Sequence, residues 1–257
     1  MNKMLLLASA AASAAATFAA TPAAASAGLP IPGTGLSVSG EANLLSDYRF
    51  RGVSRSDGDP AIQGQVTITH GSGFYVGTRA TSLDGLDNFR FRDPQFQDLG
   101  DVEFDVYAGY GRDVGAGFSV DGGLLYYAFA GGEGETDYFE PYASASYLLG
   151  PVEATAGAKY APAQGAIGNE DMLYLFGEAE ASIPFTGFAV TAHLGHQNWG
   201  RFGSYWNWSL GARTSFGPVR AGIRYVDTGL PETPLAPGRP PVTGVDGGVV
   251  LSLGVGF

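Results

Sequence analysis

Apolar and polar residues alternate along most of the chain beyond residue 35. Between Leu36 and Phe50 the even positions are mostly apolar, whereas the odd positions carry mostly polar or charged side chains. Successive side chains of a β-strand point to opposite faces, so this pattern predicts a strand with one apolar and one polar face. The same pattern predicts eleven further strands, over residues 62–69, 74–80, 102–110, 118–128, 139–149, 152–160, 173–183, 188–194, 206–216, 219–225 and 249–257.

The connections between the predicted strands alternate in length. Short turns containing Gly or Pro fall at 70–73, 111–117, 150–151, 184–187 and 217–218. Longer connections fall at 51–61, 83–101, 130–137, 161–171, 197–204 and 227–245. An even strand number with short turns at one end and long loops at the other is typical of outer-membrane barrels. The sequence therefore predicts an all-β fold, a transmembrane antiparallel up-and-down β-barrel of about twelve strands, in one domain over residues 28–257.

The two faces of the predicted strands differ in charge. The apolar face carries no Asp, Glu, Lys or Arg, and a lipid-facing surface must be this clean because Arg or Lys at bilayer depth costs about 2–4 kcal/mol. We therefore expect the charged face to line the lumen. Its acidic residues are Glu41, Asp47, Glu103, Asp105, Asp121, Glu140, Glu153, Glu178, Glu180 and Asp246, and its basic residues are Arg49, Arg51, Arg79, Lys159, Arg213, Arg220 and Arg224.

Outward-facing aromatic residues gather at two levels of the predicted barrel. At the short-turn end they are Phe74, Tyr110, Phe118, Tyr147, Phe188, Phe216 and Phe257, and at the long-loop end Tyr48, Phe50, Tyr126, Phe139, Tyr160, Trp206, Trp208 and Tyr225. A soluble sandwich could share the alternation, since its inner faces are also apolar. A soluble barrel of twelve strands would be too wide for side chains to fill. Two aromatic girdles around smaller aliphatic residues favour a membrane barrel.

The first 27 residues have the features of a secretory signal peptide. Lys3 precedes an Ala-rich apolar stretch, and Ala25-Ser26-Ala27 fits the pattern before a cleavage site. The sequence therefore predicts export, with cleavage before Gly28. An uncleaved membrane anchor is the alternative.

Composition excludes several other classes. The 257 residues carry a formal net charge of −11 at pH 7, so phosphate neutralisation would not hold the chain to nucleic acid. The chain has no cysteine, which excludes disulfides, Cys-ligated metals and a thiol nucleophile. Its 40 glycines, roughly twice the usual ~7 % share, disfavour a helical protein. Many lie within predicted strands, where small residues relieve crowding in a curved wall.

Two resemblances to known outer-membrane proteins stand out in the sequence. The last strand ends in Phe257, with apolar residues at every second preceding position, and resembles the assembly signal of bacterial outer-membrane proteins. The segments at 46–54 and 59–64, supported by those at 73–78 and 105–110, resemble the TorF-type porin family over essentially the whole exported chain. The resemblance implies a barrel that acts as a pore and supplies no substrate or catalytic residue.

Within the segment at 46–54, the charged residues Asp47, Arg49 and Arg51 have two interpretations. Their side chains could project into the pore mouth and bias which ions enter. They could instead hydrogen-bond the first loop and hold it against the wall, and this second interpretation is favoured.

No enzymatic function, cofactor or metal is expected. The His70-Gly71-Ser72 spacing could suit a hydrolase, but it falls in a short turn where no pocket forms. His193 lies at mid-strand and His196 at a strand end, and no serine beside either completes a catalytic set. Carboxylates of the 83–101 connection could activate water, but acids in surface loops are usually only solvated.

These observations predict an outer-membrane channel for passive diffusion of small hydrophilic solutes or ions. The lumen acids outnumber the lumen bases by three, which predicts a weak cation preference. A twelve-stranded lumen could be narrow, or blocked by residues 83–101 folding inward. The alternatives are a closed barrel that binds through its loops or serves a structural role, and a hydrolase. Expected partners are outer-membrane lipid, lipopolysaccharide and the barrel-assembly machinery, which would read the C-terminal strand.

Overall fold

A computed structural model describes residues 28–83, 98–230 and 244–257. Its strands are β1 (Leu29–Ile31), β2 (Leu36–Leu45), β3 (Arg49–Phe50), β4 (Val53–Ser54), β5 (Ala61–His70), β6 (Phe74–Ser82), β7 (Asp98–Gly115), β8 (Phe118–Glu133), β9 (Tyr138–Leu149), β10 (Val152–Ala161), β11 (Met172–Ser182), β12 (Phe188–Asn198), β13 (Ser204–Phe216), β14 (Val219–Thr228) and β15 (Gly248–Gly256). Two short 3-10 helices, η1 (Gly165–Ile167) and η2 (Gly200–Phe202), lie in the long connections. No helix among the described residues has the length and apolar character to cross a membrane.

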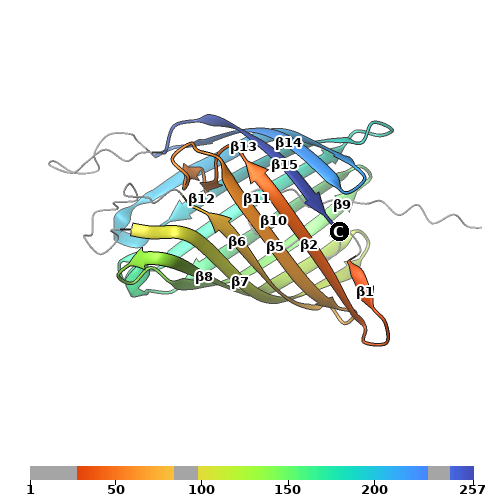
Figure 1. Ribbon diagram of the computed structural model, residues 1–257, viewed down its shortest axis with the longest axis horizontal. Coiled ribbons are helices and arrows are strands. Elements are labelled where there is room, and N and C mark those ends of the chain that lie inside the picture. The colour runs from red at the N-terminus through yellow and green to blue at the C-terminus, as the bar shows by residue number, and fades with distance from the viewer. Residues whose placement is uncertain (1–27, 84–97, 231–243) are drawn as a thin grey trace, which may run out of the picture.

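Twelve strands, β2 and β5 to β15, form one closed antiparallel barrel (Figure 1). From β5 to β15 each strand pairs with its sequence neighbours, and β2 closes the sheet by pairing with both β5 and β15. The fold class and strand number predicted from the alternation are therefore confirmed. The predicted signal peptide, residues 1–27, lies outside the described residues.

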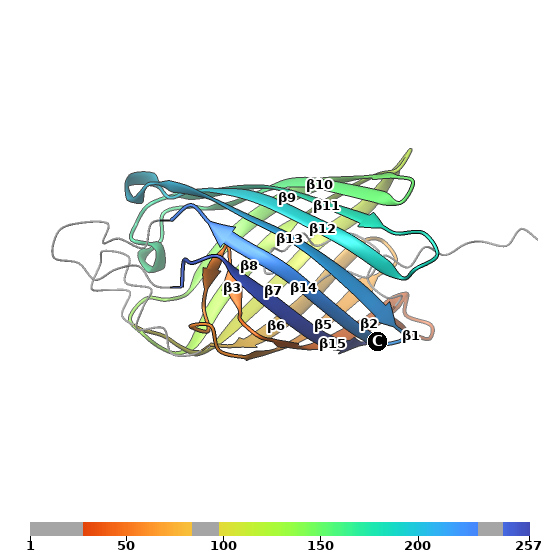
Figure 2. The same ribbon diagram turned by 90° about the horizontal axis from the view of Figure 1, so that it is seen from above.

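The strand bounds differ from the prediction in three places. β2 ends at Leu45 rather than at residue 50, because the chain then turns into the barrel. β7 and β8 extend to Gly115 and from Phe118, so Arg112 and Asp113 belong to a strand instead of a turn. The additional strand β1 pairs with the first residues of β2 at the short-turn end, near the C-terminus (Figure 2).

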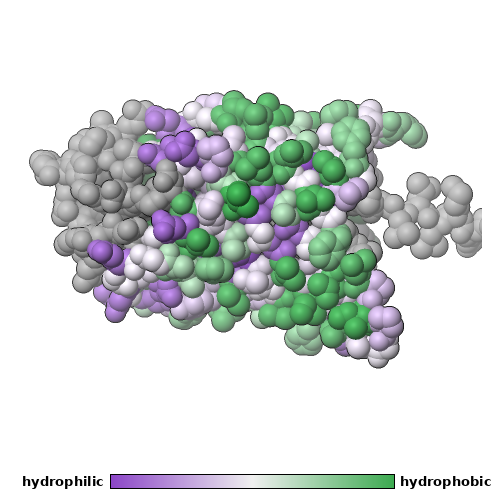
Figure 3. Space-filling view, in the orientation of Figure 1, coloured by the Kyte–Doolittle hydropathy of each residue, from purple (hydrophilic) through white to green (hydrophobic). Residues whose placement is uncertain are grey.

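The outer face of the barrel is apolar, as the alternation predicts. Exposed aliphatic residues cover the wall between the two ends, and Figure 3 shows this apolar surface, with more hydrophilic atoms toward the long-loop end. Aromatic pairs such as Phe118 and Tyr147, with ring centroids 4.4 Å apart, lie at the short-turn end. Trp208 and Tyr225, 5.4 Å apart, lie toward the other end. Tyr48 and Phe50 are the exceptions, because they are buried inside the barrel and not outward-facing.

Glycines on the inner face make room for tyrosine rings of the adjacent strand. A Cβ on Gly77 of β6 would overlap the ring of Tyr107 on β7, and a Cβ on Gly109 of β7 would overlap the Tyr75 side chain of β6. The two rings lie 6.2 Å apart between centroids. Part of the glycine excess therefore has a packing role inside the lumen.

Candidate functional site

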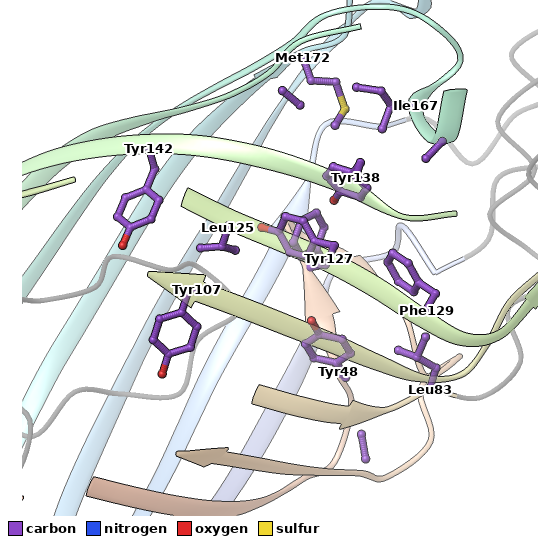
Figure 4. Packing of buried hydrophobic residues seen from close by; sticks show 14 of the residues in the cluster. Tyr48, Leu83, Tyr107, Leu125, Tyr127, Phe129, Tyr138, Tyr142, Ile167 and Met172 are labelled. Atoms are coloured by element: carbon purple, nitrogen blue, oxygen red, sulfur yellow. The ribbon is translucent and has the colours of Figure 1, made fainter. Parts of the chain in front are cut away.

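A buried cluster of aromatic and aliphatic side chains occupies the long-loop half of the lumen (Figure 4). Tyr127 of β8 and Tyr138 of β9 stack with centroids 4.6 Å apart. Phe50, which comes from the first loop and not from the wall, packs edge-on against Tyr127 at 5.7 Å. The first loop therefore contributes to the interior of the barrel.

We call residues 46–60 of this loop the inner hairpin. β3 and β4 pair within it, Phe50 opposite Val53, and leave Arg51 and Gly52 as the two turn residues. Both have positive φ, 50° for Arg51 and 89° for Gly52, which is the pattern of a type I′ hairpin turn. Positive φ suits Gly52, but it is uncommon for arginine and persists only where the surroundings impose it.

The surroundings of Arg51 lie on the far wall of the barrel. The inner hairpin enters between β2 and β5, whereas the Arg51 guanidinium donates to both carboxylate oxygens of Glu140 on β9, at 2.9 and 2.7 Å. It also donates to the Gln197 amide oxygen of β12 and lies 4.3 Å from the ring centroid of Tyr174 on β11. Tyr127 donates to the same Glu140 carboxylate at 3.1 Å. The tip of the hairpin therefore spans the lumen.

A second arginine, Arg55, holds the flank of the inner hairpin. Its guanidinium forms an ion pair with Glu103 of β7 and lies 3.7 Å from the Phe50 ring centroid. The Tyr48 hydroxyl donates to the other Glu103 oxygen at 2.9 Å. Burial raises the pKa of Tyr48 well above its usual value, and the Glu103 charge raises it further, so the phenol keeps its proton and remains a donor.

Internal hydrogen bonds give the inner hairpin its own shape. The Asp47 carboxylate accepts from Arg49 at 2.5 Å and from the Ser54 hydroxyl at 2.6 Å. The Tyr48 amide donates to the Ser56 hydroxyl at 2.9 Å, and the Arg55 amide to the Tyr48 carbonyl at 2.6 Å. Asp47 and Arg49 thus hydrogen-bond within the first loop, while Arg51 holds the loop to the wall.

The inner hairpin also contacts strands β13, β14 and β15 of the wall. A Cβ on Gly52 would lie 2.9 Å from the Cβ atoms of Asn207 on β13 and Thr228 on β14. Ser46 exchanges two hydrogen bonds with the backbone of Leu251 on β15, at 2.8 and 2.9 Å. Together with the contacts to β7, β8, β9, β11 and β12, these connect the hairpin to strands on several sides of the lumen at the long-loop level.

The short-turn half of the lumen holds polar and charged groups, several of them partly exposed. Tyr75 donates to Asp121 at 2.9 Å, Arg220 pairs with Glu41 at 2.7 Å, and Arg213 pairs with Glu180. Side chains of these two ion pairs are 14 to 22 % exposed, whereas those of Glu103 and Glu140 are 0 % exposed. Water therefore reaches the short-turn half much more readily than the hairpin level.

The balance of acidic and basic residues differs between the hairpin level and the short-turn half of the lumen. The hairpin level holds Asp47, Glu103, Asp105 and Glu140 against Arg49, Arg51, Arg55, Arg79, Lys159 and Arg224. The short-turn half holds Glu41, Asp121, Glu153, Glu178 and Glu180 against Arg213 and Arg220. Bases exceed acids at the first level, and acids exceed bases by three at the second. The sequence predicts only a total, ten acidic against seven basic residues in the lumen, whereas the structure divides the lumen charges between two levels.

Two further charged residues lie elsewhere than the sequence predicts. Arg55 belongs to the predicted 51–61 connection, yet its side chain lies inside the lumen and the residue is 4 % exposed. Asp246 was counted with the lumen and instead lies exposed before β15, where its carbonyl accepts from Arg49. The available signal was the density of charge around Tyr48 and Phe50, which is unsuited to a strand end facing lipid.

The histidines form local contacts only. His70 lies in its exposed turn, with Nδ1 2.6 Å from the Ser72 hydroxyl. His193 lies between the Tyr174 hydroxyl at 2.8 Å and Glu178 at 3.1 Å, without a serine among its hydrogen-bond partners in the described chain. Within the described ranges, no group of three or more His, Asp or Glu side chains is arranged to hold a metal.

Solved porin structures have a similar fold. A KdgM porin matches with a TM-score of 0.53 at 7 % identity, covering 86 % of this chain and 97 % of that one. A NanC porin matches with a TM-score of 0.55 at 11 % identity, covering 86 % and 99 %. A KdgM porin in complex with disordered oligogalacturonate gives 0.53 at 8 % identity. At such low identities the structural similarity shows only a shared fold, that of a porin barrel.

Sequence comparison identifies the family. No curated protein matches the chain, and the finer resemblance to TorF-type porins stays a prediction. A family described as "Bacterial protein of unknown function (Gcw_chp)" matches residues 31–257. That match spans nearly all of the chain and the whole barrel, so the protein belongs to the Gcw_chp family.

Proposed function

We propose that the protein is a porin-type channel in the bacterial outer membrane, for passive diffusion of small hydrophilic solutes or ions. The observation that carries this proposal is a closed barrel whose outer wall is apolar and whose inner wall is polar and charged. An apolar exterior between two aromatic levels suits lipid, and a charged interior needs water or paired charges. The porin fold of the similar structures supports the same function.

The membrane environment follows from the same proposal. Outer-membrane lipid and lipopolysaccharide would contact the apolar wall, with β15 ending at the seam where the assembly machinery would act. The long loops, η1 and η2 would face the cell exterior. The predicted signal peptide would supply the export step.

We also propose a weak cation preference, set in the short-turn half of the lumen. Its acidic residues exceed its basic residues by three, and the ion-paired Glu41 and Glu180 are more exposed than Glu103 and Glu140 at the hairpin level. Rings of carboxylates favour cation entry in channels. Because the basic surplus at the hairpin level opposes this effect, the preference should be small.

Solute efflux from proteoliposomes tests the channel. Vesicles containing the full chain should release small neutral sugars faster than protein-free vesicles, and should release larger oligosaccharides more slowly. In a planar bilayer under a salt gradient, the reversal potential should indicate a modest cation preference. Retention of all solutes, together with an absence of discrete conductance steps, would count against a channel.

A closed barrel remains a second candidate, and a specific observation favours it. The inner hairpin contacts wall strands on all sides of the lumen, through Glu103, Glu140, Gln197, Thr228 and Leu251. A barrel filled in this way could serve a structural or loop-mediated binding role. The same efflux measurement separates the two candidates, because a permanently filled barrel releases nothing.

A further inference from the structure

We infer that the inner hairpin, residues 46–60, is a movable gate, seated across the lumen by two arginine contacts and able to leave the wall as a unit. The inference rests on the channel proposed above, and it names how that channel opens. In the seated state Arg51 binds Glu140, and both Arg55 and Tyr48 bind Glu103. Arg49 also donates to the Asp246 carbonyl, and the Ser54 amide donates to the Gly244 carbonyl. On this inference the seated hairpin closes the lumen at this level.

The first support is the chemistry of the contacts of Arg51 with Glu140 and Gln197, which we call the seat. The tip is held to the far wall mainly by a guanidinium, a carboxylate and an amide, namely Arg51, Glu140 and Gln197. Burying an ion pair gains little net free energy because both charges lose their hydration. When the hairpin leaves the wall, water enters the lumen and these groups regain their hydration. A seat of this kind can be released more readily than an apolar plug of the same size.

The second support is the wall behind the hairpin. Without the hairpin, the long-loop half would present Gln63, Thr81, Glu103, Glu140 and Asn207 to water. A permanently filled barrel has no need of so many polar residues, since well-packed apolar residues would serve as well or better. The wall is suited to a lumen that is sometimes filled with water.

The third support is the construction of the hairpin itself. Hydrogen bonds from Arg49 and Ser54 to Asp47, and from Arg55 to the Tyr48 carbonyl, stay within it. They can persist after the wall contacts break.

Hinges lie where the hairpin joins the barrel. Ser46 stays attached to Leu251 of β15 through two backbone-directed hydrogen bonds. On the other side, Asp57 and Gly58 have φ of 52° and 83° and lie exposed before β5. Movement about these two points would carry Arg51 away from the far wall while leaving β2 and β5 paired.

A reversible disulfide tests the gate. The chain has no cysteine. A Cβ built on Gly52 would lie 2.9 Å from the Thr228 Cβ, shorter than the ~3.5–4.5 Å of a disulfide, so the hairpin tip must move outward by about 1 Å to accept the bond. The Gly52→Cys/Thr228→Cys protein, oxidised, should hold the hairpin seated and conduct far less than the same protein after reduction. The two single variants, which cannot form the bond, control for the new side chains and should not respond to reductant.

Charge removal at the seat tests the same inference in the opposite direction. Glu140→Gln leaves Arg51 buried without its carboxylate, so the open fraction of the channel should rise about tenfold or more, because removing one partner of a buried ion pair is strongly unfavourable for the seated state. Glu170→Gln is the matched control. Glu170 pairs with Arg201 at 3.5 Å in a partly exposed position away from the hairpin, and its loss should leave conductance unchanged.

The outcomes separate the gate from the channel. Equal conductance in the oxidised and reduced protein, with conductance steps present, overturns the gate and leaves the channel. A reduced protein and a Glu140→Gln protein that both stay closed, while replacement of residues 47–56 by a flexible linker opens the pore, show a permanent plug and also overturn the gate. A folded linker variant without any conductance overturns the channel itself.

Discussion

At the scale of single residues, the interior is shaped by pairs of glycine and tyrosine on adjacent strands. Gly77 lies beneath the ring of Tyr107, and a Cβ there would also come within 2.6 Å of the Val66 carbonyl oxygen. The glycine content could be predicted to relieve crowding in the wall. The particular partner of each glycine could not, because it depends on the register between strands, which the sequence pattern leaves open.

This packing predicts an asymmetric response to the same substitution at two sites. Gly77→Ala should destabilise the folded barrel by about 1–3 kcal/mol, because the added methyl group overpacks against a ring and a carbonyl. Gly64→Ala is the control, since Gly64 faces outward on β5 with open space around it. Urea unfolding in detergent, followed by tryptophan fluorescence, measures both. Equal destabilisation would contradict the packing role.

At the scale of elements, alternation located the wall strands because its period is a local property of extended chain. Alternation does not distinguish the inner hairpin from a wall strand. β3 and β4 are also extended and also alternate, so the pattern ran on from Leu36 to Phe50 without a break. Only closure of the barrel brings Arg51 to Glu140 and Arg55 to Glu103, which are 89 and 48 positions apart. No spacing rule connects such residues.

The seam between β15 and β2 is the shortest strand pairing of the barrel wall, and Phe257, the expected assembly-signal residue, directly follows β15. β15 pairs with β2 over five residues, whereas β2 pairs with β5 over ten. Phe257 extends the seam through reciprocal backbone hydrogen bonds with Gly40 at 3.0 and 3.1 Å. A Cβ on Gly40 would lie 2.7 Å from the Phe257 ring, so the ring covers this glycine.

Loss of the Phe257 ring should therefore weaken closure of the barrel. Phe257→Ala keeps the backbone hydrogen bonds but removes the cover over Gly40, and we expect a smaller folded fraction after refolding into detergent. Phe188→Ala is the control, because Phe188 is a similarly exposed aromatic at the same end and lies on β12, away from the seam. The difference in gel mobility between unheated and heated protein reports the folded fraction. Equal yields would count against a role for Phe257 in closure.

At the scale of the whole molecule, the charge of the lumen is divided between two levels. The sequence could assign charged residues to the inner face, because face follows from alternation. It could not assign their depth or their partners, and so treated paired and exposed charges alike. The structure places the acidic surplus in the short-turn half, with Glu153, Glu178 and Glu180 on neighbouring strands.

Ion selectivity should respond to the carboxylates of that half and not to charges outside the lumen. Glu153→Gln removes a lumen carboxylate that faces Glu180 across β10 and β11, so the cation preference should fall and the reversal potential should move toward zero. Asp246→Asn removes the same charge from an exposed position outside the lumen and should leave the reversal potential unchanged. A larger shift from Asp246→Asn than from Glu153→Gln would contradict the assignment.

The most direct test of the channel is single-channel recording from the barrel with residues 47–56 replaced by a flexible linker of the same length. The replacement keeps the sequence of the wall strands and removes the contacts of the hairpin with the lumen wall and with residues 244–246. We expect stable conductance steps, larger and longer-lived than those of the natural chain in the same bilayer. A correctly folded linker variant that shows no conductance steps would contradict the account.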